Sequence, residues 1–172
     1  MLIGITGKAG SGKDTVADFL VEKHGFTSVS FSDILKNGIK VLFDLSEEQL
    51  HDTDTKEKKD PRWGFTPRQL MQWFGTDILR NRVRQDFFIV HMDRFLSVNR
   101  GKNIVISDVR FENECRYIKQ HYGSIINIIR PGLREIENNS HESEQLNYPT
   151  DQDIYNDCTI PELYLKIQKF IR

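Results

Sequence analysis

The stretch from Gly7 to Thr15, which reads GKAGSGKDT, constrains this chain more than any other part of its sequence. A glycine, four further residues and then Gly-Lys is the spacing of a phosphate-binding loop when a strand precedes it and a helix follows it. The apolar residues Leu2–Thr6 predict such a strand, and the apolar residues between Val16 and Leu20 share one helical face. Glycines let backbone N–H groups approach phosphate oxygens closely, so we interpret this stretch as a nucleotide-binding loop.

The residue after the loop lysine departs from the usual pattern. Lys13 is expected to reach the β- and γ-phosphates, and the next residue is usually Ser or Thr, whose hydroxyl holds Mg²⁺. Here Asp14 stands in that position, followed by Thr15. A carboxylate near a triphosphate is repelled unless a cation lies between them, so one interpretation places Asp14 on Mg²⁺, directly or through a water. The other is that Asp14 only complements the positive end of the helix.

Size and composition indicate one globular domain spanning residues 1–172. The net charge is −1, and 28% of the residues are charged and 38% hydrophobic, so no general affinity for nucleic acid or membranes is expected. No apolar run approaches the roughly 20 residues of a membrane span, and we expect no secretory signal before Leu2. Cys115 and Cys158 have neither metal nor redox spacing, which favours reduced thiols in a cytoplasmic protein.

Strand and helix patterns alternate along the chain, which predicts an α/β fold. Apolar runs throughout most strands indicate a parallel sheet covered on both faces, giving a three-layer α/β/α arrangement with five strands. We expect the segment from His51 to Arg62, which is polar and lacks a periodic pattern, to be a mobile surface loop. The expected strands are 2–6, 26–31, 103–107, 124–129 and 153–156, and the expected helices begin near residues 13, 33, 46, 66, 85, 112 and 159. Ser32-Asp33 is expected to cap the second helix, capping boxes open the helices at Ser46, Thr66 and Thr159, and Gly123 is expected to end the helix that begins at 112.

Arginines at loop positions indicate the kind of reaction. Asp108-Val109-Arg110 and Arg130 directly follow predicted buried strands, and the carboxyl ends of parallel strands meet at one edge of a sheet. These turns should therefore converge with the phosphate-binding loop. A phosphate acceptor is already largely ionised near neutral pH, so the difficulty is to bring two anions together, which guanidinium groups do well. Arg68, Arg110, Arg130 and Arg134 thus favour a kinase with a phosphate acceptor, whereas arginines such as Arg62, Arg80 and Arg82 are interpreted as surface or packing charges.

Several further blocks carry a family resemblance. They are Ser11–Phe19, Arg68-Gln69-Leu70-Met71-Gln72 with Gly75-Thr76-Asp77, Asp108-x-Arg110, Gly123 through Gly132, Ser140–Glu144 and the tail Ile154-Tyr155-Asn156-Asp157 with Glu162-Leu163. In this order they resemble the phage- and virus-type deoxynucleoside monophosphate kinases, in which Asp-Thr after the loop lysine is ordinary. The resemblance implies ATP-dependent phosphorylation of a deoxynucleoside monophosphate, with Mg²⁺, on the phosphate-loop nucleoside monophosphate kinase fold.

The resemblance also implies residue roles. Residues of about 33–100 would bind the acceptor, and residues of about 131–150 would form a lid over ATP. The implied catalytic residues are Lys13, Arg68, Asp108, Arg110 and Arg130. ATP would bind Gly7, Ala9, Gly10, Ser11, Gly12, Lys13, Asp14, Thr15 and Arg134. The acceptor would bind Lys8, Asp33, Lys36, Arg68, Gln72, Gly75, Thr76, Asp77 and Phe88, with Trp73 as another candidate ring. Asp14 and Asp108 are the candidate Mg²⁺ ligands.

Other interpretations stay open at this point. Phosphomevalonate kinase shares the Gly-Lys-Asp ending and an Asp-x-Arg strand end, and its acceptor also ends in a phosphate. A non-catalytic nucleotide-binding switch is the alternative from another class, and DNA binding is disfavoured by the net charge of −1. The segment Leu50–Phe65 is shorter than in the phage enzymes, so the base preference cannot be carried over. Discrimination between ribo- and deoxynucleotides, homodimerisation and the roles of His141 and Glu142 are also left open.

Overall fold

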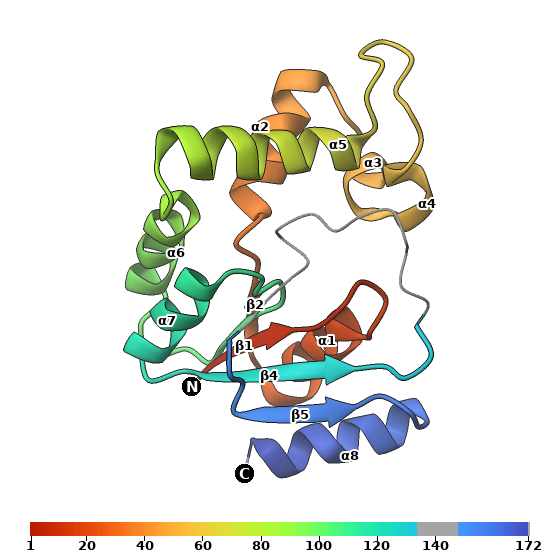
Figure 1. The fold of residues 1–172 in the computed structure, drawn as a ribbon. Coiled ribbons are helices and arrows are strands. Elements are labelled where there is room, and N and C mark those ends of the chain that lie inside the picture. Colours follow the sequence, from red (N-terminus) through yellow and green to blue (C-terminus); the bar gives the residue numbers. More distant parts are fainter. Residues whose placement is uncertain (134–147, 172) are drawn as a thin grey trace. The chain divides into compact units, whose positions relative to one another are not determined.

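The computed structural model describes residues 1–133 and 148–171. Its sheet contains β1 (Leu2–Thr6), β2 (Thr27–Val29), β3 (Ile104–Ile106), β4 (Ser124–Ile129) and β5 (Gln152–Tyr155). The strand order is β2-β3-β1-β4-β5 and every pairing is parallel, with Leu2 opposite Ile104 and Ile5 opposite Ile126. The expected five-stranded parallel sheet is confirmed, and Figure 1 shows β1, β4 and β5 running in the same direction.

Helices cover both faces of this sheet. On one face, β1 and β4 pack with α1 (Lys13–His24) and α8 (Ile160–Phe170) through a cluster that includes Ile3, Ile5, Ile126, Ile128, Phe19, Leu20 and Leu163. On the other face lies α7 (Glu112–Gln120), where Ile118 comes so close to Gly4 that a Cβ there would lie 2.6 Å from its Cδ1. The three-layer arrangement follows from the alternation of side chains along each strand.

The chain divides into two compact units. Unit 1 consists of Met1–Ser30 and Asn99–Arg172 and carries the sheet, whereas unit 2, Phe31–Val98, is helical among its described elements. The elements of unit 2 are α2 (Asp33–Phe43), α3 (Glu47–His51), α4 (Thr53–Lys56), α5 (Pro67–Gln72), η1 (Trp73–Val83) and α6 (Phe87–Val98). The acceptor-binding role expected for residues 33–100 stays a prediction.

The prediction of a surface loop from His51 to Arg62 is wrong in part, because His51 ends α3 and Thr53–Lys56 form α4, although most of the segment is exposed as expected. Asp52 accepts a hydrogen bond from the Thr55 backbone N–H at 2.8 Å and so caps α4. Asp60 is only 4% exposed, because its carboxylate accepts bonds from Arg62 Nη2 at 2.7 Å and Gln49 Nε2 at 3.0 Å. Arg62 also donates to Asp44 Oδ2 at 2.9 Å. We call Asp44, Gln49, Asp60 and Arg62 the Asp60 cluster; its members are scattered in the sequence, so no periodic pattern reveals it.

Helix ends differ from the expectation in three places. Ser32 precedes α2 but makes no capping hydrogen bond with its side chain. The helix that begins after the Thr66 capping box continues as a π-helix, η1, which is common at functional sites but has no sequence signature. Helix α7 ends at Gln120, and the left-handed residue after it is Tyr122 (φ 56°) rather than Gly123. Gly123 is instead required by close packing, because a Cβ there would lie 2.6 Å from Ile118 Cγ2.

Candidate functional site

The loop from β1 to α1 has the backbone of an anion-binding site. Gly7, Gly10 and Gly12 have φ values of 140°, 75° and 103°, which side chains rarely allow. A Cβ on Gly7 would lie 2.4 Å from the carbonyl oxygen of Ile128, so the loop can pass this close to β4 only with glycine. Successive residues in such conformations turn their N–H groups toward one concave side, where anions bind.

Lys13 and the helix behind it place positive charge at this loop. The ammonium of Lys13 donates to the carbonyl oxygens of Gly7 at 2.7 Å and Lys8 at 2.8 Å, so its charge lies within the curve of the loop. Helix α1 begins at Lys13, and its N-cap Gly12 provides no side-chain cap; the N–H groups and the dipole at such a helix start favour an anion. Ser11 Oγ is buried and makes no hydrogen bond among the described residues.

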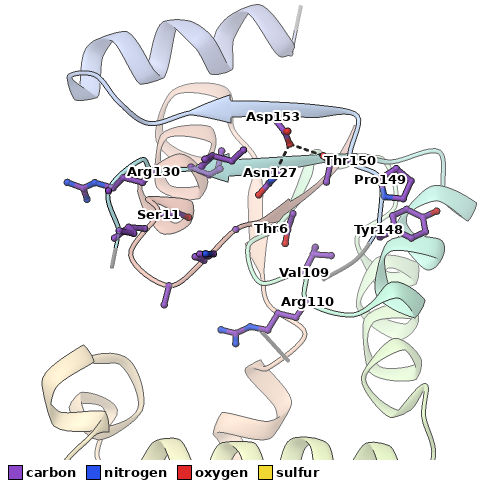
Figure 2. Close-up of a pocket in the computed structure, with 17 residues that line it drawn as sticks. Thr6, Ser11, Val109, Arg110, Asn127, Arg130, Tyr148, Pro149, Thr150 and Asp153 are labelled. Carbon is purple, nitrogen blue, oxygen red and sulfur yellow. Dashed lines mark hydrogen bonds between the residues drawn. The ribbon is translucent and has the colours of Figure 1, made fainter. Parts of the chain in front are cut away.

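A cavity of about 840 Å³ opens beside the loop, within unit 1 (Figure 2). Arg110 follows β3 and Arg130 follows β4, and both line this cavity together with Lys8, as the expected convergence of strand ends requires. Val109, the neighbour of Asp108, also lines it. Sequence analysis did not identify the polar side chains that also line this cavity, where Asn127 Nδ2 donates to Asp153 Oδ1 at 3.1 Å and Thr150 Oγ1 donates to the same oxygen at 3.1 Å.

Two further residues hold the site, and sequence analysis missed both. Glu114 is 1% exposed, and its Oε2 accepts hydrogen bonds from the backbone N–H groups of Arg110 at 2.8 Å and Phe111 at 3.1 Å. Asn156, directly after β5, donates from Nδ2 to the carbonyl oxygen of Ser11 at 2.8 Å. The first fixes the turn that carries Arg110, and the second ties the phosphate-binding loop to β5. Glu114 has no capping-box signature, because Phe111 cannot cap with its side chain, and Asn156 was marked only as part of the tail that carries the family resemblance.

The candidate Mg²⁺ ligands provide hard oxygen donors. Asp14 is exposed in the first turn of α1, and Asp108 is half-buried after β3. Among residues 1–133 and 148–171, His, Cys, Asp and Glu form no group of three or more that could hold a metal ion. Mg²⁺ commonly binds through one or two carboxylates, waters and substrate phosphates, so this donor set fits Mg²⁺ that arrives with a nucleotide.

The residues of unit 2 that are expected to bind the acceptor differ in their burial and in their contacts. Arg68 lies in the first turn of α5, and its Nε forms an ion pair with Glu57. Gly75 packs closely, since a Cβ there would lie 2.9 Å from Leu35 Cδ2, and Thr76 is buried. Asp33 and Lys36 belong to the first turns of α2, Gln72 is half-buried and Asp77 is exposed.

Phe88 is a packing residue in this structure. It is 3% exposed, and the guanidinium of Arg80 lies 4.5 Å from the centre of its ring. Arg80 itself is 8% exposed, so of the two readings of this arginine, surface or packing charge, the structure supports packing. Trp73, by contrast, is 46% exposed. Arg134 and most of the lid expected at 131–150 lie outside the described residues, as do His141 and Glu142.

Comparison with known proteins identifies a family and two relatives to which this chain is similar. A family model described as deoxynucleotide monophosphate kinase matches residues 43–167. A putative deoxynucleotide monophosphate kinase of Acanthamoeba polyphaga mimivirus is 39% identical over 181 residues, which cover 97% of this chain and 94% of the viral protein. The deoxynucleotide monophosphate kinase of Enterobacteria phage T4 is 27% identical over 128 residues, covering 70% of this chain and 50% of the phage protein.

Among solved structures, TT1252 from Thermus thermophilus aligns with a TM-score of 0.57 and 18% identity, covering 99% of this chain and 96% of that one. This likeness concerns the fold alone. Across the described part of the chain, the helices are too short or too polar to cross a membrane.

Proposed function

We propose that this chain, which belongs to the deoxynucleotide monophosphate kinase family, transfers the γ-phosphoryl group of ATP to the 5′-phosphate of a deoxynucleoside monophosphate. The observation that carries the proposal is the cavity of unit 1, in which the phosphate-binding loop, Arg110 and Arg130 come together. Kinases of this kind use a nucleoside triphosphate; ATP as the donor and Mg²⁺ as the accompanying ion are part of the proposal.

The chemistry needs charge neutralisation more than proton removal. The acceptor phosphate is already ionised near neutral pH, and phosphoryl transfer proceeds through a state whose charge spreads over the phosphoryl oxygens. Lys13 and the N–H groups of the loop would bind the triphosphate, and Arg110 and Arg130 would neutralise the oxygens that carry the developing charge. Arg68 and Lys36, both on unit 2, would bind the acceptor phosphate. In-line transfer then requires the two phosphates to be held together with water excluded.

Asp14 and Asp108 would hold Mg²⁺. The ion, when bound, neutralises charge on the triphosphate oxygens. If Asp14 contacts the ion, Asp14→Asn should raise the Mg²⁺ concentration needed for half-maximal activity. An unchanged Mg²⁺ dependence would show that Asp14 only complements the start of α1.

An acceptor panel tests the proposed function. The purified chain is incubated with ATP and Mg²⁺, and ADP formation is followed with each deoxy- and ribonucleoside monophosphate and with phosphomevalonate. We expect ADP formation with one or more deoxynucleoside monophosphates and none with phosphomevalonate. ATP binding without ADP formation, whatever the acceptor, would instead indicate a non-catalytic nucleotide switch, and activity with phosphomevalonate alone would overturn the assignment of the acceptor.

A further inference from the structure

Arg68 lies in the first turn of α5, and a capping box holds the start of this helix in place. Gln69 N–H donates to Thr66 Oγ1 at 3.1 Å, and Thr66 N–H donates to Gln69 Oε1 at 2.9 Å. Pro67 occupies the first position of α5, where its ring restricts the backbone. The Cα atom of Arg68 is therefore well defined, but the arginine side chain has several rotatable bonds, and its guanidinium needs a contact of its own to keep one orientation.

Glu57 provides that contact. Its Oε1 accepts a hydrogen bond from Arg68 Nε, and the two side chains are 51% and 22% exposed, respectively. An arginine has a flat guanidinium with donors on Nε, Nη1 and Nη2. A carboxylate on Nε leaves the edge formed by Nη1 and Nη2 for another ligand, and this edge matches two oxygens of a phosphate.

The segment that carries Glu57 is itself held in place. Glu57 directly follows α4, whose start is capped by Asp52. Between Glu57 and α5 the chain closes a tight loop, in which Asp60 N–H donates to the Phe65 carbonyl at 2.9 Å and Gly64 N–H donates to the Asp60 carbonyl at 2.8 Å. The Asp60 cluster joins this loop to the end of α2 and to α3. Hydrogen bonds on both sides of Glu57 therefore restrict the position of its backbone within unit 2.

We propose that Glu57 is a positioning residue for the acceptor phosphate, acting through Arg68. It holds the guanidinium by Nε, so that Nη1 and Nη2 bind two oxygens of the acceptor monophosphate side by side. The inference rests on the proposed function, which assigns Arg68 to the acceptor. Two effects of Glu57 oppose each other: it reduces the side-chain freedom that Arg68 loses on binding, and its negative charge repels the phosphate. The inference is that the first effect is the larger.

Steady-state kinetics test which effect prevails. In Glu57→Ala, we expect the KM for the acceptor to rise roughly three- to tenfold, the range expected when one long side chain must be ordered on binding. The KM for ATP and the thermal midpoint should stay unchanged. Glu57→Gln keeps an oxygen that can accept from Nε and should recover most of the affinity. Asp54→Asn, which removes an exposed charge from α4, is the matched control and should leave both KM values unchanged.

A double-mutant cycle shows whether Glu57 acts through Arg68. In the Arg68→Ala background, Glu57→Ala should not raise the KM for the acceptor further. A lower KM in Glu57→Ala alone would show that Glu57 competes with the substrate, and equal effects in both backgrounds would show that it acts independently; either result overturns the proposal.

The ion pair can also be observed without any reaction. The ¹⁵N–¹H signal of Arg68 Nε, identified by its absence in Arg68→Ala, should shift and exchange faster with water in Glu57→Ala but not in Asp54→Asn. If no nucleotide is phosphorylated while this signal behaves as expected, the proposed function fails and the contact stands. If the chain is an active kinase and the signal does not respond to Glu57→Ala, the positioning role fails.

Discussion

Gly12 shows how a single residue sets the shape of the phosphate-binding loop. Its φ is 103°, and a Cβ there would lie 2.6 Å from Asn156 Nδ2. Gly12→Ala should therefore lower the free energy of unfolding by roughly 1–3 kcal/mol, the range for a strained backbone position, and weaken triphosphate binding. Urea unfolding and titration with a fluorescent ATP analogue measure the two effects.

The control for this variant is Gly38→Ala. Gly38 lies inside α2, its φ is not positive, and no atom lies within 4 Å of a Cβ built there. Alanine should raise the free energy of unfolding by up to about 1 kcal/mol at such a helix position. If both variants had the same stability, the strain assigned to Gly12 would be absent.

A side-chain hydrogen bond connects Asn156 to the phosphate-binding loop at Ser11. Asn156 Nδ2 donates to the carbonyl oxygen of Ser11, so Asn156→Asp replaces a donor by a negative acceptor that faces a carbonyl oxygen. We expect the Kd for the triphosphate to rise about tenfold, which corresponds to about 1.4 kcal/mol. Asn81→Asp makes the same change at an exposed position of unit 2 and should have no effect on this Kd. Equal Kd values for the two variants would mean that this tie does not shape the loop.

At the scale of elements, the Asp60 cluster holds α2, α3 and the segment before α5 together. The hydrogen bonds from Arg62 and Gln49 keep the pKa of Asp60 far below its usual value. A carboxylate whose pKa is lower in the folded chain stabilises the fold at every pH above its unfolded pKa of about 4, and this contribution is lost as the pH falls below that value.

Asp60→Asn should consequently lower the free energy of unfolding by the same amount at about pH 7 and about pH 5, and the difference from the unsubstituted chain should shrink below about pH 4. Urea unfolding at these pH values measures this. Asp18→Asn, which removes an exposed charge from α1, should change stability little at any of them. A difference that grew as the pH fell would contradict the role of the ionised carboxylate.

At the scale of the whole molecule, the proposed function assigns the triphosphate and the acceptor to different compact units. The triphosphate loop and its cavity belong to unit 1, whereas Arg68 belongs to unit 2. Arg68→Ala should therefore raise the KM for the acceptor roughly tenfold or more, as expected for a lost hydrogen bond from a charged group, and leave the Kd for the triphosphate unchanged. A coupled assay and titration with a fluorescent ATP analogue measure these quantities.

The control is Arg82→Ala, which removes an exposed arginine from η1 and should leave both quantities unchanged. A weaker Kd for the triphosphate in Arg68→Ala would show that Arg68 does not serve the acceptor alone.

Local patterns predicted much of the fold. Apolar runs located β1, β3 and β4, and the capping boxes at Ser46, Thr66 and Thr159 located three helix starts, because these signals depend only on neighbouring residues. The rule that the carboxyl ends of parallel strands meet at one edge of a sheet likewise placed Arg110 and Arg130 beside the phosphate-binding loop. The Asp60 cluster and the partners of the site, Glu114 and Asn156, could not be predicted, since each depends on which distant segments meet.

The sequence alone thus determined the alternation of elements and the glycine loop between β1 and α1, since spacing and backbone freedom are properties of adjacent residues. Only the tertiary structure decided that Phe88 is covered by Arg80, that Gly123 is needed for packing against Ile118, and that Glu57 holds Arg68. These contacts arise from close packing and from charges brought together by the folded chain, and neither is encoded in a local pattern.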